Sequence, residues 1–179
     1  MGKIIAIANQ KGGVGKTTTS VNLSASLGVL EKKVLLIDAD PQANATSALG
    51  VEVNTGQQTI YQVLEQSTDV NNAIIKTGSP NLDIIPSTIN LVGAEIELVN
   101  QPNREKMLLK QINELKYIYD FIIIDCPPSL GLITMNCLCA SDSVLIPIQC
   151  EYFALEGLGQ LMNTIRKIQN SHNKELNIE

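Results

Sequence analysis

The sequence contains no apolar run long enough to cross a membrane. Runs such as Ile4–Ala8, Val34–Ile37 and Phe121–Ile124 are far shorter than the roughly 20 residues that a spanning helix needs. A secretory signal is not indicated either, because the first run leads directly into the polar residues 9–11 and has no small-residue cleavage site. We therefore expect a cytoplasmic protein without a membrane partner.

Histidine and metal-type cysteine pairs are also scarce. The one histidine, His172, lies in a polar segment without an acid–base partner, so we expect it at the surface. The C-x-x-C pairs of metal sites are absent. The cysteines lie in or beside apolar stretches, where a thiol packs as a small hydrophobe, so we expect reduced core cysteines and neither disulfides nor zinc. They are Cys126, Cys137, Cys139 and Cys150.

An excess of basic residues is missing too. The 13 lysines and arginines are outnumbered by 18 acidic residues, which gives a net charge of -5. Such a chain does not attract nucleic acid as a whole, and DNA contact would need a local basic patch. Repeats and low-complexity tracts are absent, and 44% of the residues are hydrophobic. We therefore expect residues 1–179 to form a single globular domain with a buried core.

Strand-like patterns alternate with helical patterns along the chain, which is typical of an α/β fold whose mostly parallel, twisted sheet has helices on both faces. We expect strands at residues 3–8, 33–38, 81–86, 119–125 and 143–148, and the opening of another at 176–179. We expect helices at residues 16–30, 104–116, 130–140 and 154–169. The segments 51–58 and 77–81 resemble surface connections. Because the chain ends as a strand begins, we expect it to stop within the fold.

A glycine-rich segment lies between the first expected strand and its helix. Backbone N–H groups and the dipole at a helix N-terminus attract an anion, and glycines let the chain approach phosphates closely. Lys16 would reach the β- and γ-phosphates, and the Thr17 hydroxyl would bind Mg²⁺. The segment therefore predicts an ATP-binding loop. Its expected binding residues are Lys11, Gly12, Gly13, Val14, Gly15, Lys16, Thr17 and Thr18.

This loop departs from the common pattern G-x-x-x-x-G-K-[ST]. Gln10 stands where that pattern has glycine, and an additional lysine, Lys11, follows it. A γ-phosphoryl group in transfer carries negative charge, and a cation delivered by a second subunit can raise the rate by ~10³ to 10⁵. Lys11 is the candidate for this cation. Two roles stay open, because Lys11 could reach a partner's nucleotide or touch its own.

Carboxylates follow two of the expected strands, at the sheet edge where open α/β sheets bind ligands. Asp38 and Asp40 end the second strand and share a face by the period of two, and Asp125 ends the 119–125 strand. Burying a carboxylate without a partner is costly, so these residues indicate a metal or cation nearby. We expect Asp125 to hold Mg²⁺ through water. The alternative, a helix N-cap, is disfavoured by the two prolines at 127–128.

These motifs resemble the ParA/MinD family of deviant Walker-A P-loop ATPases. The family signature K-G-G-x-G-K-[ST] matches residues 11–17, and the likeness continues through 38–42, 124–128 and 147–149 with 156–158. Residues 40–46, Asp-Pro-Gln-Ala-Asn-Ala-Thr, resemble in particular chromosome-partitioning ParA proteins of the Soj type. The resemblance covers nearly the whole chain and implies a P-loop NTPase fold with Mg-ATP as its cofactor.

The resemblance also implies roles for individual residues. Lys11 would reach across a homodimer to the partner's ATP, and Lys16 would bind the phosphates. Asp40 would position the attacking water, and Asp38 would support it near Lys11 or near Mg²⁺ through water. As plain chemistry, a water-positioning carboxylate contributes typically ~10² to 10⁴ in rate. The loops 41–47 and 126–131 would be switches that the γ-phosphate orders.

The function that the resemblance implies is chromosome or plasmid segregation. The ATP-bound dimer would bind nonspecific DNA on the nucleoid, and a ParB-type centromere-binding protein would stimulate slow hydrolysis. The family's adenine and DNA contacts lie largely beyond residue 179, so we expect weak ATP and DNA binding. Two alternatives stay open. One is a regulator or scaffold that dimerises with little hydrolysis. The other is a redox relative such as the nitrogenase iron protein, for which Cys126 is a poor match.

Overall fold

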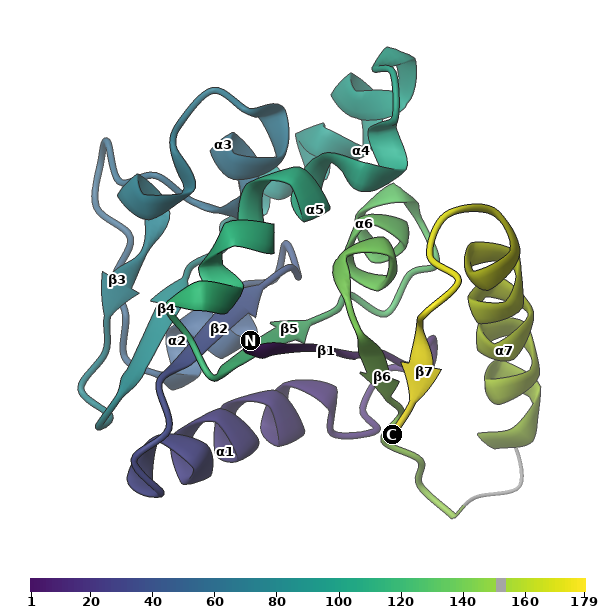
Figure 1. The fold of residues 1–179 in the computed structure, drawn as a ribbon, viewed down its shortest axis with the longest axis horizontal. Coiled ribbons are helices and arrows are strands. Elements are labelled where there is room, and N and C mark those ends of the chain that lie inside the picture. The colour runs from purple at the N-terminus through teal and green to yellow at the C-terminus, as the bar shows by residue number, and fades with distance from the viewer. Residues whose placement is uncertain (151–153) are drawn as a thin grey trace.

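A computed structural model describes residues 1–150 and 154–179 (Figure 1). These residues form a seven-stranded sheet in the order β3-β4-β2-β5-β1-β6-β7. The strands are β1 (Lys3–Ile7), β2 (Val34–Asp38), β3 (Ile75–Lys76), β4 (Leu82–Ile85), β5 (Phe121–Asp125), β6 (Ser143–Leu145) and β7 (Asn177–Ile178). Neighbouring strands pair in parallel except β3, which runs antiparallel to β4. The expected mostly parallel sheet is confirmed.

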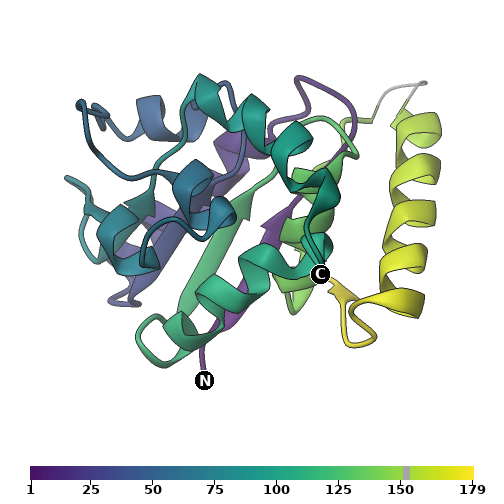
Figure 2. The same ribbon diagram turned by 90° about the horizontal axis from the view of Figure 1, so that it is seen from above.

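Helices cover both faces of this sheet (Figures 1 and 2). The α-helices are α1 (Lys16–Val29), α2 (Asn44–Ala48), α3 (Ile60–Glu65), α4 (Ala94–Glu97), α5 (Met107–Ile112), α6 (Leu132–Ala140) and α7 (Ala154–Ser171). Successive strand residues point to opposite faces, so Ile4 and Ala6 join one hydrophobic cluster with α3, α5 and α6, while Ile5 and Ile7 join a second cluster with α1. The two clusters form the core. No helix among the described residues is both long and apolar enough for a membrane span.

Two expected elements are shorter or more irregular than the sequence pattern predicts. The strand expected at 143–148 ends at Leu145, because the next segment turns to the glycine-rich loop, where the Pro147 carbonyl accepts a hydrogen bond from Asn9. The helix expected at 104–116 is broken into η4 (Arg104–Lys106), α5 and η5 (Asn113–Tyr117). The break between η4 and α5 comes from Asn136 of α6, whose side chain accepts from the backbone N–H of Leu108 and donates to the carbonyl of Arg104.

Residues 44–100 contain several short elements that the pattern did not predict. Besides α2, α3, α4 and β3, they include η1 (Val70–Ala73), η2 (Ile89–Gly93) and η3 (Leu98–Asn100). The start of α3 carries a capping box, in which Thr59 and Gln62 exchange hydrogen bonds. The pattern Thr-x-x-Gln in the sequence is typical of such a helix start. The expected connections 51–58 and 77–81 contain no helix or strand.

The cysteines are free, but they do not share one environment. Cys126, Cys137 and Cys139 are buried as expected, whereas Cys150 is exposed. The expectation of a core position is wrong for Cys150 because β6 ends five residues earlier. No cluster of metal-type ligands occurs within the described residues. His172 is partly exposed just after α7.

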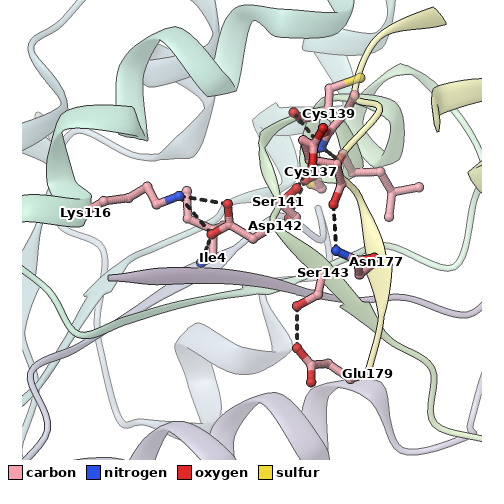
Figure 3. Close-up of polar contacts among 12 residues, drawn as sticks. Ile4, Lys116, Cys137, Cys139, Ser141, Asp142, Ser143, Asn177 and Glu179 are labelled. Carbon is pink, nitrogen blue, oxygen red and sulfur yellow. Dashed lines mark hydrogen bonds and ion pairs between the residues drawn. The ribbon is translucent and has the colours of Figure 1, made fainter. Parts of the chain in front are cut away.

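Polar contacts hold β6 and the last strand, β7, in the sheet (Figure 3). The Asp142 carboxylate accepts hydrogen bonds from the backbone N–H of Ile4 at 2.8 Å and from the Lys116 ammonium at 2.8 Å. The Ser143 hydroxyl donates to Glu179, and β7 pairs with β6. The strand expected to open at 176–179 is therefore confirmed.

Candidate nucleotide-binding site

The glycine-rich loop connects β1, near the middle of the sheet, to the start of α1. Gly13 and Gly15 have φ angles of 74° and 89°, in the left-handed region that favours glycine. Helix α1 has no side-chain N-cap and no acidic residue in its first turn. The unpaired N–H groups and the dipole at this end therefore favour an anion.

One cavity of about 530 Å³ lies over this loop, and its lining includes six of the eight residues expected to bind the nucleotide. It is lined by Gly12, Gly13, Gly15, Lys16, Thr17, Thr18, Asp40, Gln42, Asn44 and Pro128. A Cβ built on Gly12, Gly13 or Gly15 would meet no protein atom within 4 Å. A side chain at these positions would take up space beside the loop that phosphates would need.

The cavity brings the loop together with residues that sequence reasoning did not assign individually. Gln42 and Asn44 come from the segment 41–47 that was expected to be a loop, where Asn44 in fact begins α2, and Pro128 comes from the 126–131 loop. The sequence indicates these residues only indirectly, because each lies in a segment that the family resemblance predicts to be a switch. Their placement shows that both loops border the same cavity as Lys16 and Asp40.

Polar side chains fasten the glycine-rich loop to the segment after β6. The buried Asn9 side chain accepts from the Lys11 backbone N–H at 3.0 Å and donates to the Pro147 carbonyl at 2.8 Å. The Gln149 amide donates to the Gly13 carbonyl at 3.0 Å. Gln149 lies within the 147–149 motif and Asn9 lies two residues before the 11–17 signature, but only the fold brings both to the same loop.

The two lysines of the loop occupy different places. Lys16 is buried, and its ammonium donates to the Lys11 carbonyl at 3.3 Å. Lys11 is half-buried and is not part of the cavity lining, and its Cβ lies 4.0 Å from the position of a Cβ built on Gly157 of α7. Gln10, the residue that replaces the usual glycine, has a buried Oε1 without a hydrogen-bond partner. This placement leaves both proposed roles of Lys11 open.

Asp38 ends β2 and holds the loop that follows. Its Oδ1 accepts from the Asp40 backbone N–H at 3.2 Å, and its Oδ2 accepts from the Thr46 N–H at 2.8 Å and the Thr46 hydroxyl at 2.7 Å. The Thr46 Oγ1 in turn accepts from the Ser87 N–H at 3.0 Å, after β4. Burial raises the pKa of Asp38, and the hydrogen bonds from Thr46 oppose this rise.

Asp125 ends β5 directly beside Asp38 in the sheet register. Its Oδ1 lies 2.9 Å from the Ser20 hydroxyl of α1, whereas its Oδ2 is buried without a hydrogen-bond partner. Burial raises the pKa of Asp125 to about 6, and the nearby hydroxyls of Thr17 and Ser20 oppose this rise. Neither hydroxyl donates a hydrogen bond to Oδ2. A buried carboxylate oxygen without a donor suits a bound cation or its water.

Asp40 lies past the end of β2, so the period of two no longer governs it. The expectation that Asp38 and Asp40 share a strand face is therefore wrong. Asp38 is fully buried against Thr46, while Asp40 lines the cavity and its Oδ1 accepts from the Gln42 N–H at 2.9 Å. Of the three acids at this sheet edge, Asp40 belongs to the cavity lining, and Asp38 and Asp125 do not.

The donor set fits magnesium held together with phosphates. Magnesium is usually bound by one or two carboxylates together with substrate phosphates, and it rarely uses an all-protein cage. Thr17 lines the cavity, and Asp125, which is outside the lining, keeps a buried Oδ2 without a partner, while the described residues form no group of three or more metal-type ligands. The arrangement therefore fits a magnesium ion that is bound together with phosphates.

The sequence of this chain is similar to those of known proteins. Residues 2–178 match the family model described as an AAA domain. The chain is 60% identical to the sporulation initiation inhibitor protein Soj of Bacillus subtilis (strain 168), over all of this chain and 71% of that protein. It is 52% identical to the chromosome partitioning protein ParA of Myxococcus xanthus (strain DK1622), over all of this chain and 63% of that protein. The chain thus spans about two thirds of their lengths.

Solved structures share the fold. A cobyrinic acid a,c-diamide synthase from Mycobacterium smegmatis with bound ATP analog and magnesium has a TM-score of 0.95 and 38% identity, covering 99% of this chain and 72% of that chain. A plasmid partition protein from Borrelia burgdorferi has a TM-score of 0.85 and 37% identity, covering 99% and 76%. Cyanothece McdA in an ATP complex has a TM-score of 0.94 and 29% identity, covering 99% and 68%.

Proposed function

Because this chain belongs to the ParA/Soj family of P-loop ATPases, we propose that it is an ATP-dependent partitioning ATPase for chromosome or plasmid segregation. The observation that carries this proposal is the shared cavity. Glycines, Lys16 and Thr17 of the phosphate loop line it together with Asp40 and with residues from both expected switch loops. The start of α1 attracts anions and lies beside a carboxylate, a combination that suits a phosphate with its metal ion.

In this proposal the chain binds ATP with Mg²⁺. The phosphates lie along residues 12–18, where N–H groups at the start of α1 and the Lys16 ammonium complement their charge. The Thr17 hydroxyl and, through water, Asp125 hold the metal, with Asp38 behind them. Relatives with ATP or an ATP analog bound support this assignment.

Hydrolysis in this proposal is slow and acts as a timer. Water attacks the γ-phosphorus and the bond to the β-phosphate oxygen breaks, which releases ADP and phosphate. Asp40 orients the water from the cavity wall. Lys11 stabilises the charge on the γ-phosphoryl group of a partner subunit, so that each site is complete only in the ATP-bound homodimer.

The proposed partners follow from the family. The ATP-bound dimer binds nonspecific DNA on the nucleoid in the cytoplasm, and a ParB-type protein stimulates hydrolysis and releases it. The relatives named for chromosome and plasmid partition support this reading. A net charge of -5 means that DNA must meet a local basic surface.

A second candidate is an ATP-switched regulator or scaffold that dimerises with little hydrolysis. The B. subtilis relative named a sporulation initiation inhibitor favours it. Multiple-turnover phosphate release, with and without DNA and a ParB-type protein, separates the two candidates. Turnover that both additions stimulate supports the ATPase, and less than one phosphate per subunit supports the regulator.

The catalytic assignment is tested by Asp40→Ala in the native polypeptide that carries these 179 residues. We expect phosphate release to fall by ~10² to 10⁴, while binding of a fluorescent ATP analogue persists. Glu114→Ala, which changes an exposed acid in η5, is the matched control and should leave both unchanged. Full turnover in the Asp40 variant would refute the role of Asp40.

The role of Lys11 is tested by gel filtration with a poorly hydrolysed ATP analogue. If Lys11 acts in the partner's site, Lys11→Ala should lose the nucleotide-dependent dimer while still binding the analogue. Lys32→Ala, at an exposed position after α1, is the control. A Lys11 variant that dimerises normally and hydrolyses more slowly would favour the local role.

A further inference from the structure

The 126–131 loop ends at a helix that has no cap of its own. The loop carries Pro128 into the lining of the cavity, and α6 begins directly after it. The N-cap position of α6 is Gly131, which offers no side chain to the first N–H groups of the helix. Such groups need an acceptor from elsewhere.

Glu95 of α4 supplies this acceptor from a distant part of the chain. Its Oε2 accepts from the Leu132 N–H at 3.0 Å, and its Oε1 accepts from the Ile133 N–H at 3.3 Å. A carboxylate at a helix N-terminus also interacts favourably with the helix dipole. One side chain therefore caps α6 with both of its oxygens.

The close fit between Glu95 and the loop depends on glycine. A Cβ built on Gly131 would lie 2.4 Å from the Glu95 Oε1, so any other residue there would displace the carboxylate. Ala94 and Leu98, which flank Glu95 in the chain, are buried in the core. The capping carboxylate is thus attached to a fixed part of the molecule.

A second contact holds the same end of the loop. The Thr134 hydroxyl donates to the Ser129 carbonyl at 2.6 Å. The other end of the loop continues from Asp125 in β5. With both ends held, the place of Pro128 in the cavity wall depends on where α6 starts, and the Glu95 carboxylate accepts the first N–H groups at that start.

We propose that Glu95 is a positioning residue for ATP hydrolysis, which acts by holding the 126–131 loop at the end of α6. This inference rests on the proposed ATPase function and extends it. Glu95 does not line the nucleotide cavity, so it affects turnover through the loop alone. The contact also makes α4 an element whose displacement would change hydrolysis.

The first test is Glu95→Ala in the native polypeptide. Small misplacements of a site can cost up to about 100-fold in rate, and we expect kcat to fall about 10-fold. We expect KM for ATP to change less than about 3-fold, because Glu95 does not touch the phosphate loop. Amide hydrogen exchange at Leu132 and Ile133 should become faster in the nucleotide-free protein. Glu97→Ala, an exposed residue of the same helix that bonds Tyr61, is the control and should change neither.

The second test uses Gly131→Ser, whose effect should reverse sign with the background. Gly131 has φ -78° and ψ -168°, a conformation in which serine is a good N-cap. In the wild type the new Cβ would lie 2.4 Å from the Glu95 Oε1, so the serine and the carboxylate crowd each other and neither caps α6 well, and kcat should fall. In the Glu95→Ala background the serine can cap α6 instead, so both the exchange protection and kcat should recover.

The outcomes separate this inference from the proposed function. A wild-type protein that releases no phosphate would refute the ATPase and the positioning role together. Normal wild-type turnover with unchanged kcat in Glu95→Ala, despite faster exchange, would refute the positioning role alone. The same holds if the double variant regains protection at Leu132 and Ile133 without regaining turnover.

Discussion

The ends of β2 and β5 are neighbours in the sheet and each carries a buried aspartate, yet the two carboxylates differ in their hydrogen bonds. Asp38 and Asp125 are register partners, both are fully buried, and burial raises the pKa of both. The oxygens of Asp38 accept three hydrogen bonds from the segment that follows it. Asp125 accepts one, from Ser20, and keeps its Oδ2 without a donor.

This difference indicates two different tasks at one sheet edge. A carboxylate that is fully hydrogen-bonded within the protein stabilises the conformation of its loop, and here it ties the 40–46 segment to β2. A buried oxygen without a donor is costly, and proteins keep such atoms mainly where a ligand, ion or water completes them. We therefore expect Asp38 to matter more for stability and Asp125 more for magnesium.

Between these two acids, the larger expected effect on turnover comes from exchanging Asp125. Asp125→Asn keeps the size of the side chain and an acceptor for Ser20, but it removes the charge that a cation needs. Loss of a group that holds a metal through water typically costs 10- to 100-fold, and we expect phosphate release to fall about 100-fold. Titration of phosphate release against magnesium measures this effect, and the variant should need far more magnesium than the wild type.

The matched variant is Asp38→Asn. Its new N–H₂ group would face the donors of Asp40 and Thr46. We expect its midpoint in denaturant to fall further than that of Asp125→Asn, with a smaller change in magnesium requirement. Equal shifts in magnesium requirement for both variants would contradict the division of tasks.

The next effect is a dependence of stability on pH. The pKa of Asp125 is raised from 3.8 to about 6 in the folded protein, so its contribution is fully present below pH 3.8 and is lost as the pH rises through about 6. The shift corresponds to at most about 3 kcal/mol in the free energy of unfolding. Denaturant unfolding without nucleotide from pH 4 to 7 measures it.

Asp38 contributes to this pH dependence in the same direction, because its pKa is also raised. Asp125→Asn should therefore flatten the profile without abolishing its slope. Magnesium with a nucleotide should stabilise the wild type more at pH 7 than at pH 5, since the cation favours the charged carboxylate. A wild-type profile identical to that of Asp125→Asn would show that this carboxyl does not titrate as described.

The smallest effect concerns the hydroxyl that links Asp38 to the end of β4. Thr46→Val keeps the shape but removes the donor to Asp38 and the acceptor for the Ser87 N–H. We expect the free energy of unfolding to fall by about 1 to 2 kcal/mol, the cost of leaving a buried donor unpaired. Thr68→Val, at a partly exposed position, is the control and should be close to neutral. Unchanged stability in the Thr46 variant would mean that water replaces the lost partner.

Local patterns carried much of the information about the fold and the site. Alternating strand and helix patterns predicted the parallel sheet, because burial on both faces demands continuous apolar strands. The glycines of residues 12–15 between a strand and a helix predicted the phosphate loop, because left-handed backbone and open helix N–H groups are properties of short segments. Acids at strand ends predicted the carboxylate edge.

The partners of these residues were decided only by the tertiary structure. Ser20 and Asp125 are 105 residues apart, and Glu95 lies 37 residues before the Leu132 that it caps. Asn136, on another helix, interrupts the helix expected at 104–116 by bonding Arg104 and Leu108. A sequence pattern reports the preferences of a segment for itself, whereas a hydrogen bond depends on which segments meet. For that reason Asp38 and Asp125 look alike in the sequence and differ in the folded chain.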